Sequence, residues 1–170
     1  MLPIHFIRRV REGDFHLDYD YQFNYYNNKA VVDEKRRQNS KTDTIDIISC
    51  SYDIMSSVYF SRAINFNKYT IDDTIPMNVI LDKQIFKDLY IIYKGIKKVT
   101  CQNKKVVECI HFQANLIEGT IFKADESMNV FVSNDLNRIP IYVEAEILVG
   151  AVRVYSSSIK GTKTPMKYLK

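Results

Sequence analysis

The stretch "DFHLDYDYQFNYY", residues 14–26, alternates apolar and polar side chains with a period of two. Its apolar positions are Phe15, Leu17, Tyr19, Tyr21, Phe23 and Tyr25, and its polar positions are His16, Asp18, Asp20, Gln22 and Asn24. Successive side chains of a strand point to opposite faces, so this pattern predicts a strand with one buried and one solvated side. The turn residues Asn27 and Asn28 and the returning segment "KAVVDEKR" extend this prediction to a long hairpin.

The rest of the chain contains mostly strand-length apolar stretches separated by turn-forming residues. They begin at Thr42, Ile75, Gln84, Ile96, Lys105, Gly119, Met128, Arg138 and Gly150. One segment differs, because Ile54, Met55, Val58, Tyr59, Ala63 and Phe66 recur at helical spacing. This spacing predicts one helix near residues 52–65, and Asp53 in its first turn complements the helix dipole. We therefore predict a mainly β fold, a strongly curved, half-barrel-like antiparallel sheet packed around a single α-helix.

The composition fits one globular domain. The chain has 170 residues, of which 46% are hydrophobic and 26% charged, and it predicts a single β-rich domain over residues 1–170. The net charge of +4 is spread along the chain. The run "DEKRRQNSK", residues 33–41, mixes both signs and indicates a solvated loop rather than a nucleic-acid surface. No apolar run is long enough for a transmembrane segment. The start of the chain lacks the pattern of a secretory signal.

Motifs for common chemistries are missing from the sequence. There is no glycine-rich phosphate loop and no serine-hydrolase or zinc-protease motif, so we predict no cofactor and assign no catalytic residue. The histidines and cysteines have no metal-ligand spacing, and we expect no metal site and free, buried thiols. These residues are His5, His16, His111, Cys50, Cys101 and Cys109. Acidic and amide residues between the aromatic residues of the opening stretch disfavour binding of nucleic acid.

Four ordered motifs carry a family resemblance. They are "RRVREGDF" (8–15), "DIMSSVYFSR" (53–62), "LIEGTIFK" (116–123) and "SNDLNRIP" (133–140), the last followed by a Val-Gly pair at 149–150. Together they resemble an exported bacterial family catalogued as domain of unknown function 3108. The resemblance runs over nearly the whole chain. Phe131 stands where the family tends to have tryptophan, which preserves an aromatic anchor.

The resemblance implies a location and a missing start. Family members are exported, which implies a periplasmic or envelope-associated protein, whereas a chain complete as written would be cytoplasmic. Members typically begin with an export signal and further β-rich sequence, and here Met1 replaces both. We therefore expect a C-terminal portion or shortened copy that lacks its N-terminal strands. Its segment "PIHFIRRV", residues 3–10, would then form an open edge through which the chain self-associates.

Two functional hypotheses of different classes follow. The first is a non-catalytic binding or structural module for an apolar or amphiphilic ligand or for an envelope partner, because a sheet wrapped on a helix can enclose a cavity. The alternative is an enzyme acting on envelope glycan or lipid, with Glu12, Glu118 or Asp53 as acid or base. The candidate ligand-binding residues are Glu12, Arg62, Glu118 and Arg138. We expect Arg62 to pair with Glu12 or Glu118, and Arg138 to form either an ion pair that ties its turn to the sheet or a ligand contact.

Overall fold

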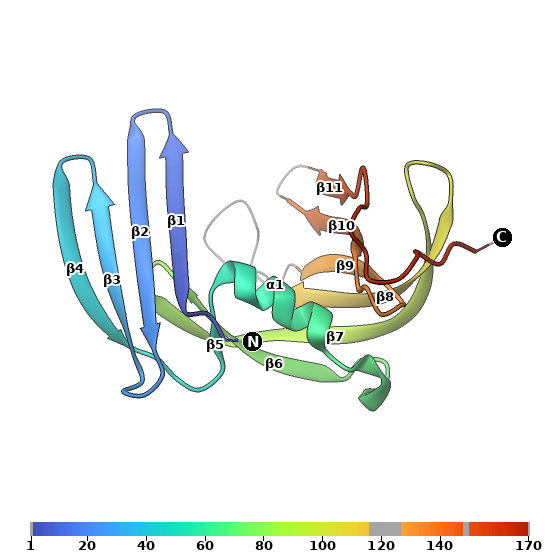
Figure 1. Ribbon diagram of the computed structural model, residues 1–170, viewed down its shortest axis with the longest axis horizontal. Coiled ribbons are helices and arrows are strands. Elements are labelled where there is room, and N and C mark those ends of the chain that lie inside the picture. The colour runs from blue at the N-terminus through green and yellow to red at the C-terminus, as the bar shows by residue number, and fades with distance from the viewer. Residues whose placement is uncertain (1, 116–126, 148–149, 170) are drawn as a thin grey trace. The chain divides into compact units, whose positions relative to one another are not determined.

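The computed structural model describes residues 2–115, 127–147 and 150–169 of a mainly β protein with one α-helix, which confirms the predicted fold class. Its strands form a four-stranded sheet in the order β1-β2-β3-β4 and a seven-stranded sheet in the order β11-β10-β9-β8-β7-β6-β5 (Figure 1). All described pairs are antiparallel except β5 with β6, which is parallel. The chain divides into two compact units, residues 1–60 with 77–88 and residues 61–76 with 89–170. The single domain over residues 1–170 stays a prediction.

The elements follow in simple order along the chain. They are β1 (His5–Glu12), β2 (Phe15–Asn24), β3 (Lys29–Arg36), β4 (Asn39–Asp46), β5 (Ser51–Tyr52), α1 (Ile54–Ala63), the 3-10 helix η1 (Phe66–Lys68), β6 (Thr74–Leu81), β7 (Gln84–Thr100), β8 (Val106–Asn115), β9 (Ser127–Ser133), β10 (Pro140–Glu146) and β11 (Ala151–Tyr155). The expected strand at residues 119–124 lies outside the described residues.

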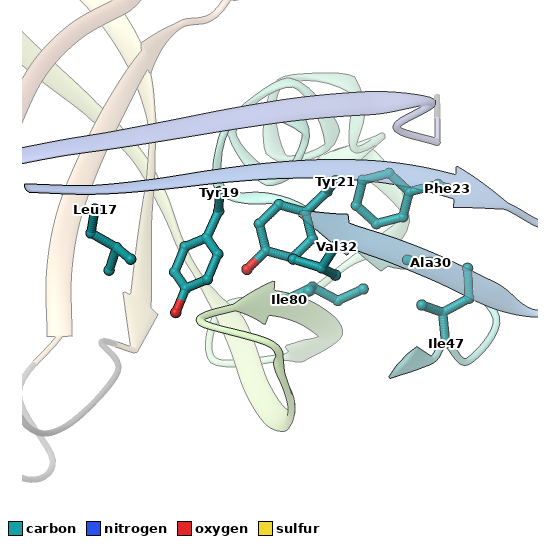
Figure 2. Packing of buried hydrophobic residues seen from close by; sticks show 8 residues of the cluster. All are labelled: Leu17, Tyr19, Tyr21, Phe23, Ala30, Val32, Ile47 and Ile80. Carbon is teal, nitrogen blue, oxygen red and sulfur yellow. The ribbon is translucent and has the colours of Figure 1, made fainter. Parts of the chain in front are cut away.

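The core of the first unit lies under β2. Leu17, Tyr19, Tyr21 and Phe23 are each at most 8% exposed, whereas their polar neighbours face solvent or are half-buried. This contrast confirms the period-two prediction, except that Phe15 is 39% exposed because it begins the strand beside the hairpin turn. The same core contains Ala30, Val32, Ile47 and Ile80 (Figure 2).

The mixed-charge run at residues 33–41 forms the end of β3, a turn and the start of β4, instead of the predicted loop. Its pairing is regular up to Arg36 opposite Asn39, and Arg37 in the turn has a φ of 53°. A hairpin exposed along its edge accommodates charged residues because their side chains reach water from either face. The charge pattern therefore predicted correctly that this run faces solvent, but it did not predict that the run forms strands.

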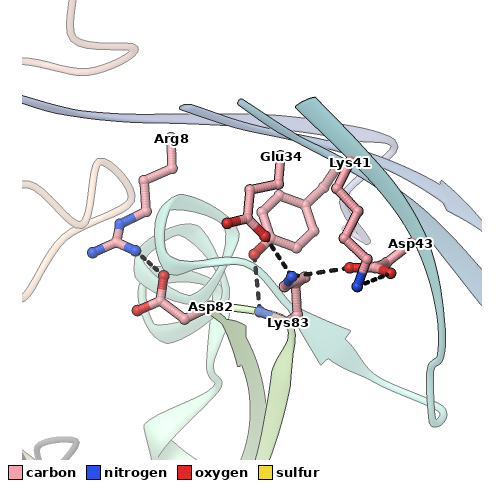
Figure 3. Close-up of polar contacts among 7 residues, drawn as sticks. Arg8, Glu34, Lys41, Asp43, Asp82 and Lys83 are labelled. Atoms are coloured by element: carbon pink, nitrogen blue, oxygen red, sulfur yellow. Dashed lines mark hydrogen bonds and ion pairs between the residues drawn. The ribbon is translucent and has the colours of Figure 1, made fainter. Parts of the chain in front are cut away.

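The tip of the β6–β7 hairpin is anchored by charge in the first unit. Asp82 and Lys83 both have positive φ, as a two-residue hairpin turn with the right twist requires. The Lys83 Nζ donates to Glu34 Oε2 at 2.5 Å and to Asp43 Oδ2 at 2.9 Å, and Arg8 forms an ion pair with Asp82 (Figure 3). The tip is thus tied by side chains of opposite charge to β1, β3 and β4.

Helix α1 begins where Asp53 caps it. The Asp53 Oδ1 accepts from the backbone N–H groups of Met55 at 2.8 Å and Ser56 at 3.0 Å, which satisfies two donors of the first turn. The expected packing face is only partly correct. Phe66 is buried, but four of the predicted positions are 37–55% exposed, namely Ile54, Met55, Val58 and Tyr59. Apolar side chains occur on more than one side of this short helix, so spacing alone does not identify the packed face.

The second unit contains β7 from Leu89 onward and β8 to β11. The stretches predicted as two strands from Gln84 and from Ile96 form one 17-residue strand, β7, whose register shifts between Tyr93 and Ile96. On one face of the sheet Phe112 stacks on Phe66. On the other face a buried cluster of Val107, Cys109 and Ile141 is covered by Ile159 and Met166. We call residues 156–169, which carry the latter two, the C-terminal strap. No described helix has the length and apolar character needed to cross a membrane.

Candidate functional site

Four aromatic rings line up across β8, β9, β10 and β11. They are His111, Phe131, Tyr142 and Tyr155, here called the aromatic row. His111 is paired with Phe131, Phe131 with Tyr142, and Tyr142 with Tyr155. Directly paired residues project on the same face of a sheet, so the four strands present one continuous aromatic line.

The rings of the row are stacked face to face. Successive ring centroids are 4.3, 5.4 and 4.5 Å apart, with interplanar angles of 6°, 27° and 26°. In a stack, the face of each ring contacts the face of the next, so the ring edges point outward. The faces of the inner rings are thus occupied, and a ligand lying along the row meets mainly ring edges.

A hollow of about 430 Å³ lies over the row. It is lined by the four rings and by Lys97, Lys98, Val99 and Thr100 of β7. Three of the rings are half-buried, and Tyr155 is 39% exposed. Next to it, the same face of β8 is covered by the C-terminal strap over Cys109, two residues before His111. The open part of this face is therefore the part that carries the aromatic row.

The ring of His111 is held neutral. Burial lowers the pKa of His111, the hydrogen bond with Asn129 opposes this shift, and Lys97 and Lys94 lower the pKa further. The Asn129 Oδ1 lies 2.9 Å from His111 Nε2 and also accepts from Gln113 Nε2 at 3.2 Å. Because this oxygen is an acceptor, the proton of the neutral ring lies on Nε2, and the buried Nδ1 has no described hydrogen-bond partner.

Tyr142, an inner ring of the row, is also uncharged. Burial raises the pKa of Tyr142 to about 12, and hydrogen bonds with Glu144 and Tyr155 raise it in the same direction. The Arg153 Nε donates to Glu144 Oε1 at 2.6 Å, and this contact lowers the pKa of Glu144. The carboxylate that bonds to Tyr142 is thus paired with Arg153.

The lining of the hollow is mainly aromatic and apolar. Its one group with an ordinary pKa near neutral pH is His111, whose ring is neutral, and none of the described lining residues is a carboxylate that could form an acid–base pair with it. The arrangement offers an apolar surface bordered by two lysines.

The sequence-predicted residue Arg62 organises the turn between β9 and β10. Its Nε donates to the carbonyl oxygen of Arg138 at 2.7 Å, and its Nη2 donates to that of Asn137 at 3.1 Å. The expected carboxylate partner stays a prediction, because Glu118 lies outside the described residues and Glu12 belongs to the other compact unit. Arg62 therefore joins the helical segment to the turn through backbone groups.

The turn that Arg62 binds is built around Asp135. The Asp135 Oδ1 accepts from the Ser133 hydroxyl at 2.8 Å and from the N–H groups of Asn137 at 2.9 Å and Arg138 at 3.3 Å. Asn137 also bonds outside the turn, because its Nδ2 donates to the carbonyl oxygen of Thr164 at 2.9 Å and so fastens the C-terminal strap.

Arg138 occupies an unusual position in this turn. Its φ is 50°, its guanidinium forms no ion pair with any described residue, and its buried Nη1 has no hydrogen-bond partner among them. The ion pair that was expected to tie this turn to the sheet is not formed within the described part of the chain. Neither Arg62 nor Arg138 lines the hollow over the aromatic row.

The other predicted candidates are dispersed. Glu12 ends β1 at an exposed hairpin turn, Asp53 is 3% exposed and caps α1, and Glu118 lies outside the described residues. A second hollow of about 490 Å³ occurs in the first unit. Its lining, Asp14, Phe15, His16, Arg36 and Arg37, is entirely exposed at two hairpin ends. We prefer the hollow over the aromatic row because its rings are half-buried and held in register by four strands.

Sequence reasoning missed the aromatic row as a unit. Phe131 was noted as an aromatic anchor and His111 as a histidine outside any metal set, but nothing in the spacing of the four residues joins them. Their only shared signal is that each lies inside a predicted strand with apolar neighbours. The pairing register turns these separate positions into a site.

Comparison with known proteins gives one match. Searches of curated proteins and of solved structures find no match. The sequence profile described as "Protein of unknown function (DUF3108)" matches residues 1–156. This range contains all four motifs quoted above, all described strands and the complete aromatic row. The chain therefore belongs to the DUF3108 family of proteins of unknown function.

Proposed function

We propose that the protein is a non-catalytic binding module of the cell envelope that holds an apolar or amphiphilic ligand on its aromatic row. The observation that carries the proposal is the hollow of about 430 Å³ over four rings stacked in register. Small-molecule sites are typically concave, lined by apolar and aromatic side chains, and bordered by a few polar groups. The envelope location rests on the family resemblance alone.

The neutral forms of His111 and Tyr142 support this role. An apolar chain displaces water from the surface it covers, and covering a charged ring would cost several kcal/mol of desolvation. Both rings are uncharged near neutral pH, so they can be covered at little electrostatic cost. Contacts with an apolar chain stabilise the complex by about 25 cal/mol per Å² of apolar surface removed from water.

The proposal is tested with the uncharged fluorescent probe N-phenyl-1-naphthylamine, whose emission rises in apolar surroundings. We expect saturable binding to the full chain, weakened at least about tenfold by Phe131→Ala, because removing a central ring opens the row. Phe15→Ala is the control, since it removes a phenylalanine ring from the lining of the other hollow. Its affinity for the probe should stay within about twofold of wild type. Equal affinities of wild type and Phe131→Ala would refute the assignment of the site.

A further inference from the structure

The hollow over the aromatic row is bordered by two lysines that form no ion pair with any described residue. They are Lys97 and Lys98, of which Lys98 is paired across the strands with Glu108. The other cations of this region are already paired, Lys94 with Asp72 at 2.5 Å and Arg153 with Glu144 at 2.6 Å. The uncompensated charge at the hollow is thus positive.

This charge is located at one end of the row. Lys97 is paired with Cys109, which lies on the same face of β8 as His111 and precedes it by two residues. The row runs from His111 on β8 to Tyr155 on β11, across three strand spacings of roughly 4.8 Å each. Lys98 is paired with Glu108 and so belongs to the opposite face. A ligand lying along the row therefore meets Lys97 at its β7 end and aromatic edges along the rest of its length.

The stacked rings favour the same polarity. The edge of an aromatic ring carries the positive part of its quadrupole, and its face carries the negative part. Because the inner rings turn their faces toward one another, a ligand meets the positive edges. A cationic headgroup is disfavoured by both Lys97 and the edges, and an anionic headgroup is favoured by both.

We propose that the aromatic row binds a monomeric, single-chain amphiphile with an acidic headgroup, whose chain crosses the row and whose headgroup lies at Lys97. This inference rests on the proposed function and adds the chemical class of the ligand. The shape of the site favours a single extended chain, since the row is one line of rings on one sheet face. None of the described residues that line the hollow is a carboxylate that would repel an acidic headgroup.

The test compares three ligands with the same ten-carbon chain as competitors of N-phenyl-1-naphthylamine, each below its aggregation concentration. They are decanoate, decanol and decyltrimethylammonium. We expect decanoate to bind about threefold to fivefold more tightly than decanol, because an exposed ion pair contributes roughly 0 to 1 kcal/mol. Decyltrimethylammonium should bind most weakly. Raising the salt concentration should reduce the preference for decanoate, since exposed charges are screened.

Two variants test whether the preference depends on Lys97. In Lys97→Met, decanoate and decanol should bind with affinities within about twofold of each other, and decanol should bind as in wild type. Lys87→Met is the matched control, because Lys87 is an exposed lysine of β7 outside the hollow and its loss changes the net charge equally. It should keep the full preference for decanoate.

Each outcome decides a separate claim. If decanol and decanoate bind wild type equally and both are lost in Phe131→Ala, the proposed function stands and the acidic ligand is wrong. If neither competes with the probe, both proposals fail. If wild type sediments with phosphatidylglycerol vesicles in a manner that depends on Lys97, while monomeric decanoate does not compete, the partner is a membrane surface and the inference is wrong.

Discussion

The turn between β9 and β10 depends on one carboxylate, and replacing Asp135 tests how much that turn contributes to stability. Asp135→Ala removes the acceptor of three groups, the Ser133 hydroxyl and the backbone N–H groups of Asn137 and Arg138. Hydrogen bonds to a charged group each contribute about 1.5 to 3 kcal/mol, but water replaces part of them because Asp135 is only half-buried. We expect Asp135→Ala to lower the free energy of unfolding by about 2 to 3 kcal/mol.

The variant Asp135→Asn removes the negative charge of this side chain but keeps an oxygen that accepts hydrogen bonds. This variant keeps an oxygen at the same place and should cost about 1 kcal/mol, since neutral hydrogen bonds are weaker than charged ones. Asp46→Ala is the control, because the Asp46 side chain is 87% exposed and pairs only with Lys29 among the described residues. It should change the free energy of unfolding by less than about 0.5 kcal/mol. The measurement is urea unfolding at neutral pH, compared at equal slopes.

The pH dependence of this difference has a defined sign. Partial burial alone would raise the pKa of Asp135, but hydrogen bonds from Ser133, Asn137 and Arg138 outweigh it and lower the pKa. Such a group stabilises the fold above the ordinary carboxyl pKa, and the stabilisation is lost as pH falls through the lowered pKa. The advantage of wild type over Asp135→Asn should therefore shrink in acid. An unfolding free energy of Asp135→Ala within 0.5 kcal/mol of wild type, or an advantage over Asp135→Asn that grows in acid, would refute the reasoning.

Three further predictions concern the hairpin anchor, the strap and the sheet edge. Lys83→Ala should lower the free energy of unfolding in urea by about 1 to 2 kcal/mol, a value between those typical of exposed and of buried ion pairs. Lys41→Ala is the control and should lower it by less than about 0.5 kcal/mol, because the Lys41 side chain is 70% exposed. Equal costs would contradict the anchor. Asn137→Ala should loosen the C-terminal strap, since lost hydrogen bonds favour local opening, and should speed thiol labelling of Cys109 by roughly tenfold or more. An unchanged labelling rate would show that the strap does not depend on Asn137. The chain should self-associate through the edge strand β1 in sedimentation velocity, and Ile7→Pro should weaken this by removing an outward N–H group. A wild type that stays monomeric at all concentrations would contradict the edge prediction.

The sequence predicted best where a local pattern determines structure. The alternation along β2 identified its buried face because a one-residue shift would expose every aromatic ring of that strand. The helix was placed correctly, but its packed face was not, since Val58 and Tyr59 have the spacing of a buried stripe and are 42% and 51% exposed. Helical spacing shows that side chains share a face, and tertiary packing decides which face is covered.

The candidate site was least predictable because it depends on pairing between distant strands. Arg62 was recognised as a motif residue, yet its partners are backbone carbonyl groups, which leave no trace in side-chain chemistry. His111 and Tyr155 are more than forty positions apart, and only the register of β8 to β11 places them in one row. The missed residues thus share a position on the sheet and no sequence motif.

The most direct measurement of the binding site is an NMR titration of tyrosine-labelled protein with decanoate. Ring signals are assigned with single Tyr→Phe variants, and Tyr26, which is fully exposed and does not line either hollow, serves as the internal reference. We predict saturable shifts of Tyr142 and Tyr155 with one common dissociation constant and no shift of Tyr26. A binding site on the aromatic row would be contradicted if the ring signals of Tyr142 and Tyr155 stayed unchanged. It would also be contradicted if all exposed tyrosines shifted without saturation.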